Sequence, residues 1–250
     1  MTNQKGAKLS GVCDQRLASQ AVLVGEVRWF RCAVPLGFVL AGCGGVSAPP
    51  SGRVPEMPAT TSMPAGALVA IESVAPTVMT DMRYATTDNF AHEAVYAEAR
   101  CLLRPEVAER IARVEHRVEA AGYRLKVWDC YRPFSVQQRF WKLVPDERYV
   151  ARPVVEGGRP VEGSRHNRAA AVDITLVTAD GAAVEMPTAH DDFTEAAARE
   201  GKGWSAEAKA HYDILDTALR AEGFTGLPTE WWHYDAPGWE AYELLDAPLE

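Results

Sequence analysis

The sequence predicts a single compact α+β domain with a mostly antiparallel sheet flanked by helices. Of its 250 residues, 47% are hydrophobic and 24% are charged, which is typical of a globular protein. Helical stripes and short alternating strand patterns both occur along the chain. They follow one another without the regular alternation of strand and helix that predicts a parallel sheet.

Residues 1–43 are predicted to be a signal peptide. Arginines precede a short apolar run, Cys32 to Leu40, and small residues follow it. That run is too short to span a bilayer. The tetrapeptide Leu40-Ala41-Gly42-Cys43 resembles the lipobox of bacterial lipoproteins, in which the cysteine is lipidated and becomes the new N-terminus.

This resemblance implies a lipid anchor on Cys43, which would hold the protein at a membrane of the bacterial cell envelope, facing the periplasm. Residues 44–66 are rich in proline, serine, threonine and glycine, and are predicted to form an extended tether. Residues 67–250 are then the folded domain. The alternative is a plain signal peptide cut near Ala48, and the length of the leader indicates a start codon downstream of Met1.

The first part of the domain contains a weak strand pattern, a loop and a helix. The strand pattern runs from Glu72 to Arg83, and residues 84–90 are predicted to be a loop. Proline suits the first helical turn and glycine the C-terminal cap, so a helix is predicted from Pro105 to about Gly122. Its buried stripe, with spacing i, i+4, i+7 and i+11, consists of Val107, Ile111, Val114 and Val118.

The remaining elements follow from alternation, apolar runs and capping residues. Ser205 is a suitable N-cap and Gly223 a suitable stop for the last helix. The predicted strands are 123–128, 170–177 and a short one at 183–186, and the predicted helices are 134–143 and 205–222.

Two motifs together form a candidate metal centre. Two imidazoles and one carboxylate, His166, Asp173 and His233, make a complete protein ligand set for one catalytic Zn²⁺, with a fourth position left for water. Glu230 stands three residues before His233 and is free to act as a base on that water. Taken singly, a histidine such as His166 is usually structural, and the segment from Glu230 to His233 is equally well explained as an aromatic core strand with a solvated glutamate.

If His166, Asp173 and His233 bind one ion, with Glu230 beside it, the local structure must meet certain conditions. Because side chains alternate along a strand, His166 must lie in the loop before the strand that carries Asp173. For the same reason, Glu230 must lie at the mouth of the strand that carries His233, or a bulge must separate them. Asp173 is surrounded by apolar residues, and a buried carboxylate needs a partner or a metal.

Arg132 follows a predicted strand in the segment Asp129-Cys130-Tyr131-Arg132-Pro133. A sharp turn there would project the guanidinium group into a cleft, where it would bind a carbonyl oxygen as it becomes an oxyanion. The simpler interpretation is a surface arginine paired with Asp129.

Four segments jointly resemble the zinc D-alanyl-D-alanine dipeptidases, the VanX-type enzymes. They are Ser-x-His-x6-Asp, Glu-Trp-Trp-His, Tyr-Arg-Pro and Tyr-Ala-Thr-x-Asp-Asn-Phe, and the resemblance runs from about Ile71 to Trp239. It implies the α+β fold shared with zinc D,D-carboxypeptidases and hedgehog N-terminal domains, so that residues 67–250 are a zinc peptidase domain. The implied activity is hydrolysis of D-Ala-D-Ala, in cell-envelope peptide turnover.

The resemblance also implies roles for individual residues. Glu230 would be the general base and acid, and Arg132 would stabilise the oxyanion. The implied zinc ligands are His166, Asp173 and His233, and the implied substrate-binding residues are Tyr84, Ser164 and Asp191.

Several positions depart from the family pattern. Ala169 stands where glycine is usual, and would strain the loop that orients His166 if the position needs a positive φ. His190 and Pro187 replace a usual phenylalanine and a usual glycine, and Glu98 stands where tyrosine is common. These departures bear on turnover and substrate preference more than on metal binding.

Two other functions are compatible with the motifs. One is a D,D-carboxypeptidase that acts on longer peptidoglycan stem peptides, and the other is a non-catalytic zinc-containing module that binds muropeptides. Retention of both Glu230 and Arg132 favours catalysis. The net charge of -8, without a Lys/Arg-rich stretch, argues against a nucleic-acid partner. Cys101 and Cys130 either pair in an oxidising compartment or remain separate thiols.

Overall fold

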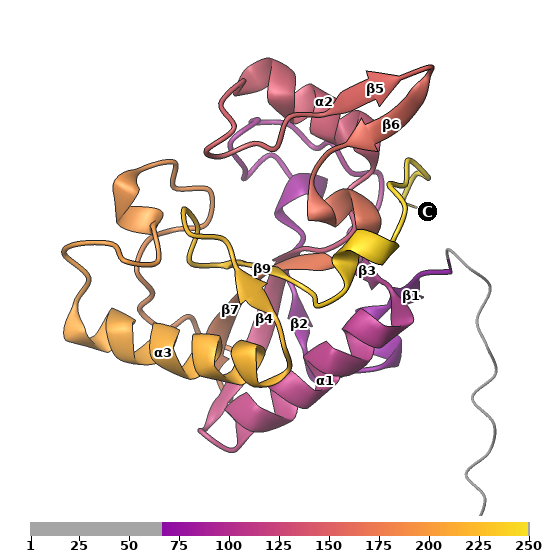
Figure 1. Ribbon diagram of the computed structural model, residues 1–250. Coiled ribbons are helices and arrows are strands. Elements are labelled where there is room, and N and C mark those ends of the chain that lie inside the picture. Colours follow the sequence, from indigo (N-terminus) through magenta and orange to yellow (C-terminus); the bar gives the residue numbers. More distant parts are fainter. Residues whose placement is uncertain (1–66, 250) are drawn as a thin grey trace, which may run out of the picture. The chain divides into compact units, whose positions relative to one another are not determined.

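A five-stranded sheet in the order β2-β4-β7-β9-β8 forms the centre of the domain (Figure 1). The computed structural model describes residues 67–249. Strands β2 and β4 run parallel, and the other neighbouring pairs are antiparallel. The five strands are β2 (Met79–Thr80), β4 (Tyr123–Asp129), β7 (Ala171–Thr178), β8 (Thr225–Gly226) and β9 (His233–Asp235). The predicted α+β class with a mostly antiparallel sheet is confirmed.

Helices α1 (Pro105–Glu119) and α3 (Ala206–Ala221) lie side by side and pack against the sheet. Helix α2 (Phe134–Leu143) lies on the other side of the domain, beside the hairpin of β5 (Val154–Glu156) and β6 (Arg159–Glu162). A further antiparallel pair consists of β1 (Val69–Ala70) and β3 (Leu102–Leu103). Among the described helices, none is both long enough and apolar enough to cross a membrane.

Helices α1 and α3 begin at the residues that the sequence indicates. Proline occupies the first turn of α1, and the predicted stripe of four residues on this helix is buried. The hydroxyl of Ser205 accepts a hydrogen bond from the backbone N–H of Ala208 at 3.0 Å, which caps α3. Gly223 follows α3 with a φ of +86°, a conformation that glycine adopts without strain.

Strand β7 is the middle strand of the sheet and is buried from Ala171 to Val177. Because side chains alternate, Val172 and Ile174 face one side of the sheet and Asp173 faces the other. Asp173 is opposite Asp129 of β4 and opposite His233 of β9. Three polar side chains therefore lie in a row across adjacent strands of an otherwise apolar core.

Some predicted elements differ from the structure. The strand expected at 183–186 is reduced to a single bridge between Val177 and Ala183, because the chain turns tightly at Gly181 and Pro187 has no N–H for a ladder. The strand expected between Glu72 and Arg83 is broken into short 3₁₀ turns and the two-residue β2. Strands β1, β3, β5, β6 and β8 were not anticipated.

Cys101 and Cys130 are paired in a disulfide, with Cα atoms 5.1 Å apart. The sequence left this pairing open. Both residues are fully buried, next to the segment that carries Asp129 and Arg132. The predicted signal peptide, the lipidation at Cys43 and the tether at 44–66 lie outside the described residues.

Candidate functional site

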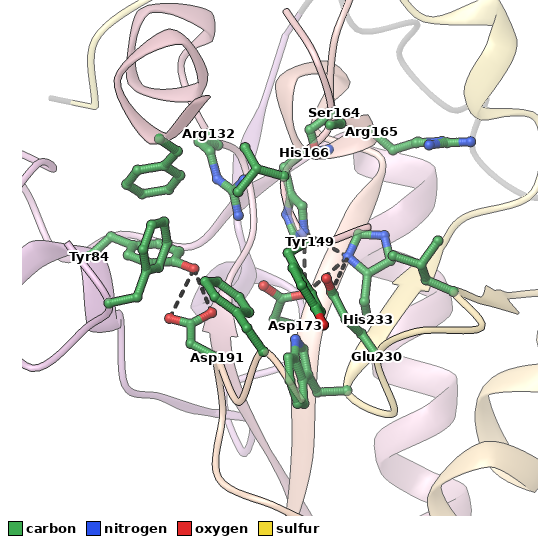
Figure 2. Close-up of a pocket in the computed structure, with 17 residues that line it drawn as sticks. Tyr84, Arg132, Tyr149, Ser164, Arg165, His166, Asp173, Asp191, Glu230 and His233 are labelled. Carbon is green, nitrogen blue, oxygen red and sulfur yellow. Dashed lines mark hydrogen bonds and ion pairs between the residues drawn. The ribbon is translucent and has the colours of Figure 1, made fainter. Parts of the chain in front are cut away.

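Neighbouring strands place a carboxylate and an imidazole directly opposite each other. Asp173 and His233 pair across β7 and β9, so their side chains share one face of the sheet. His166 lies in a 3₁₀ helix, η3 (Arg165–Arg168), just before β7, as convergence with Asp173 requires. Ser164 caps this helix, because its hydroxyl accepts a hydrogen bond from the backbone N–H of His166 at 3.3 Å. Figure 2 shows the three side chains directed toward one another.

Three ligand atoms converge on one point. Nε2 of His166 and Nδ1 of His233 are 3.1 Å apart, and Oδ1 of Asp173 is 3.3 Å and 3.1 Å from them. Nδ1 of His166 lies 2.7 Å from the carbonyl oxygen of Cys130, and Nε2 of His233 lies 2.9 Å from Oδ1 of Asp235. Each ring can donate its proton outward and direct a lone pair at the Asp173 carboxylate. In that state the three atoms form a ligand set for a cation.

The spacing suits a tetrahedral zinc ion. Bonds of about 2.0–2.1 Å place neighbouring donors of such an ion about 3.3 Å apart, close to the three distances of 3.1, 3.1 and 3.3 Å. All three residues are buried, and their ligand atoms lie within 4.8 Å of one another. Three protein ligands leave one position open, which is the arrangement of catalytic zinc sites.

The electrostatics of the site favour positive charge. Burial alone would raise the pKa of Asp173, but His166, His190 and His233 lower that pKa well below its usual value. Burial alone would lower the pKa of His233, but Asp173 and Asp235 raise that pKa to about 10. The carboxylates therefore attract a proton or a metal cation to this point.

Glu230 lies in the turn before β9, at the mouth of the strand. Its Oε2 is 4.0 Å from Nδ1 of His233, and its side chain is buried. Burial, reinforced by Asp173 and Asp191, raises the pKa of Glu230 to about 8. A carboxyl group that titrates near neutral pH is suited to take up and release a proton.

Arg132 is buried at the pocket and is not the surface arginine of the simpler interpretation, although it does pair with Asp129. Its Nε and Nη2 donate to Oδ2 of Asp129 at 3.0 Å and 2.7 Å, and its Nη1 donates to Oε1 of Gln137 at 2.8 Å. These contacts use three of the five N–H groups of the guanidinium. The other two can donate to a ligand in the pocket.

The residues assigned to the substrate line the same pocket. The Tyr84 hydroxyl donates to the carboxylate of Asp191, at 3.0 Å and 3.2 Å from its two oxygens. Burial raises the pKa of Asp191, although His190 opposes this effect. In Figure 2, Tyr84 and Asp191 face the metal-binding side chains across the pocket, and Ser164 lies beside His166.

Sequence reasoning missed Asp235 and Tyr149, and it named His190 only as a departure from the family pattern. Asp235, which orients His233, could have been found because it lies two residues further along the same face of β9. His190 reaches Oδ2 of Asp173 with its Nε2 at 3.4 Å, a contact that only the fold brings about. Tyr149, which stacks on Phe193 with ring centroids 5.0 Å apart, lines the pocket without any sequence signal.

The cavity between these side chains has a volume of about 60 Å³. Pockets for drug-sized ligands typically measure about 300–1,000 Å³. Tyr84, Arg132, Asp173, Glu230 and His233 contribute to its lining, so a ligand there would contact the candidate metal centre, the base and the guanidinium together. The small volume favours a very small polar substrate.

Comparison with known proteins gives one consistent result. A family model described as D-ala-D-ala dipeptidase matches residues 65–246. The D-alanyl-D-alanine dipeptidase of Escherichia coli is 30% identical over 178 residues, which cover 71% of this chain and 89% of that protein. The enzymes of the same name from Enterococcus faecalis and Enterococcus faecium are 30% and 28% identical, over 67% and 66% of this chain and 86% and 88% of their own.

Proposed function

This chain belongs to the D-Ala-D-Ala dipeptidase family, and from this membership we propose that it is a zinc-dependent hydrolase of D-alanyl-D-alanine. The observation that carries the proposal is the convergence of two imidazole nitrogens and a carboxylate oxygen beside a buried glutamate. The carbonyl oxygen of Cys130 can only accept, so a neutral His166 donates from Nδ1 and presents the lone pair of its Nε2 to this point.

His166, Asp173 and His233 would hold the ion, and the outward hydrogen bonds to Cys130 and Asp235 keep both rings in the tautomer that binds metal. Zinc supplies Lewis acidity at the scissile carbonyl and lowers the pKa of a water molecule. The small cavity leaves little room for other water beside the reacting groups.

Glu230 is the proposed general base and acid. Its carboxylate accepts a proton from the attacking water, and its carboxylic acid then returns that proton to the departing amine nitrogen. Burial raises the pKa of Glu230 above the usual glutamate value, which favours this second step because a less acidic carboxyl holds the proton until the C–N bond breaks. Metal binding does not require Glu230, since three ligands are already provided.

Arg132 and the polar lining are proposed to bind the substrate. Two free N–H groups of Arg132 would donate to the carbonyl oxygen as negative charge develops on it. Asp191, oriented by Tyr84, supplies a carboxylate for the ammonium end of the dipeptide. Ser164 accepts from the His166 N–H and keeps its own hydroxyl proton for the other polar end.

The proposal is tested with the full-length protein loaded with one zinc per chain. It should hydrolyse D-Ala-D-Ala, and a tripeptide ending in D-Ala-D-Ala should react far more slowly because the cavity is small. Preferred cleavage of the tripeptide would make the protein a D,D-carboxypeptidase instead. Failure to cleave either peptide, with zinc bound, would favour the muropeptide-binding module.

Substitution of Glu230 tests whether this residue is a general base and not a metal ligand. Glu230→Gln should keep its zinc and lose about 10²–10⁴-fold in kcat, the usual contribution of a general acid or base. Glu240→Gln, at an exposed position, is the matched control and should retain full activity. Normal turnover in Glu230→Gln would mean that another residue is the base. Loss of zinc from the variant would mean that Glu230 is a metal ligand.

We also propose a place of action in the bacterial cell envelope, with Cys43 lipidated and the chain anchored to a membrane, facing the periplasm. The support is the sequence Leu40-Ala41-Gly42-Cys43 after an apolar run, followed by a proline-rich segment. Turnover of cell-wall-derived dipeptides outside the cytoplasm would suit this place.

A further inference from the structure

The two carboxylate oxygens of Asp173 have different neighbours. Oδ1 faces the two imidazole nitrogens of the candidate metal centre, at 3.1 Å from His233 and 3.3 Å from His166. Oδ2 faces away from them, and Nε2 of His190 lies 3.4 Å from it. Among the described residues, His190 is the side chain that forms a hydrogen bond with this second oxygen.

Packing holds the His190 ring in place. The ring stacks on Trp128, with centroids 4.8 Å apart and an angle of 27° between the planes. It meets Trp232 edge to face at 5.4 Å, and its side chain is only 5% exposed. A ring fixed between two indoles can direct its N–H at one acceptor without a large loss of side-chain entropy.

A donor at this place has a clear physical role. Asp173 is 3% exposed, and a buried carboxylate oxygen without a hydrogen-bond partner costs free energy. Without a donor, the carboxylate is free to rotate, and its second oxygen can compete for the ion. A hydrogen bond to Oδ2 leaves Oδ1 as the single oxygen directed at His166 and His233.

We propose that His190 is a positioning residue, whose N–H holds the Asp173 carboxylate in the orientation that binds zinc through one oxygen. The inference rests on the proposed function, since it takes zinc as the ion held by His166, Asp173 and His233. Hydrogen-bonding partners of metal ligands typically change metal affinity by about 10–100-fold.

The substitution His190→Phe separates the hydrogen bond from the packing. Phenylalanine keeps a flat aromatic ring between Trp128 and Trp232 and has no N–H. His190→Gln is the rescue variant, because its side-chain amide nitrogen can reach the place of Nε2. His116→Phe is the matched control, since this histidine lies on α1 with its side chain 78% exposed.

The measurement is the zinc dissociation constant of the full-length protein, by competition with a chelator, together with circular dichroism of each variant. We expect about 10–100-fold weaker binding in His190→Phe, near-wild-type binding in His190→Gln, and no change in His116→Phe. Unchanged affinity in His190→Phe would overturn the proposal. Equal weakening in His190→Gln would also overturn it, because the donor would then not be the cause.

X-ray absorption of the zinc-loaded proteins distinguishes a positioning residue from a ligand. Two histidine ligands in both the wild type and His190→Phe are expected. Three in the wild type and two in the variant would make His190 a ligand and overturn the positioning role. A wild type that binds no zinc contradicts the proposed function itself, whereas tight wild-type binding with an unaffected His190→Phe contradicts only this inference.

Discussion

Ala169 occupies the left-handed backbone conformation, which is unfavourable for most residues other than glycine. It ends η3 with φ +55° and ψ +34°, between the ligand His166 and strand β7. The left-handed conformation costs about 1–2 kcal/mol for a residue other than glycine. The sequence predicts strain in this loop if Ala169 has a positive φ, and the structure gives it one. The methyl group of Ala169 is fully buried, which offsets part of that cost.

We expect Ala169→Gly to keep its zinc and to raise the free energy of unfolding modestly, by up to about 1 kcal/mol. Relief of about 1–2 kcal/mol of strain outweighs the loss of one buried methyl group, about 0.8 kcal/mol. Ala170→Gly is the matched control, because Ala170 is equally buried but has no positive φ. Urea unfolding should show Ala170→Gly clearly destabilised, and similar destabilisation of both variants would contradict the strain argument.

At the scale of elements, one glutamate joins the two long helices. Glu222 follows the C-terminus of α3 and accepts hydrogen bonds from Arg113 at 2.7 Å and Arg117 at 2.9 Å, both on α1. Arg110 of α1 donates to the backbone carbonyl oxygen of Glu222 at 2.8 Å. Three arginines on one face of α1 thus hold the end of α3, the helix that packs against β7 and β8 beneath the site.

Glu222→Gln should lower the free energy of unfolding by about 1 kcal/mol at neutral pH, a modest effect because both arginines are half-exposed. The hydrogen bond from Arg113 is the main cause of a lowered pKa of Glu222 in the folded state. The stabilising effect is therefore present above the ordinary glutamate pKa of about 4.5 and is lost as the pH falls below it.

Urea unfolding of the metal-free protein tests this pH dependence without interference from zinc release. The difference between wild type and Glu222→Gln should shrink from pH 7 to pH 4. Glu109→Gln, at an exposed position of α1, serves as the control and should unfold like the wild type at both values. A difference that grows at acidic pH would show that Glu222 is not stabilised by its charge.

For the whole molecule, the disulfide between Cys101 and Cys130 joins the residue before β3 to the residue after β4. The backbone carbonyl of Cys130 is also the acceptor for His166, so the crosslink restrains a segment that orients a metal ligand. It closes a loop with a sequence separation of 29. Chain-entropy arguments give a stabilisation of about 3–4 kcal/mol for a loop of this size.

The double variant Cys101→Ala, Cys130→Ala should therefore unfold at a clearly lower temperature, with a loss of about 2–4 kcal/mol. Wild-type protein treated with a reductant that does not bind zinc should show a similar loss. Equal melting temperatures for oxidised and reduced wild type would mean that the two thiols do not pair in solution.

The proposed lipid anchor on Cys43 would determine where in the cell the whole molecule is located. Cell fractionation should recover the wild type with membranes, and Cys43→Ser should lose lipid-dependent processing and change fraction. Recovery of the wild type from the cytoplasm would reject the export proposal and would restore a role on a cytoplasmic dipeptide pool.

Local patterns in the sequence were sufficient for much of the fold. Helix α2 has the predicted bounds, and α1, α3, β4 and β7 lie within a few residues of theirs, because apolar periodicity and capping residues act over one or two turns. The motifs also indicated His166, Asp173, His233 and Glu230 as one site, and the register of β7 with β9 brings Asp173 opposite His233.

Other features depended on contacts between residues that are distant in sequence. The disulfide and the approach of His190 to Asp173 both follow from how loops pack over the sheet. The short strands β1 and β3 form only because residues 69–70 and 102–103 meet. The periodicity of side chains along one segment does not indicate which distant segment it will contact. That contact depends on burial and hydrogen bonding in the assembled domain.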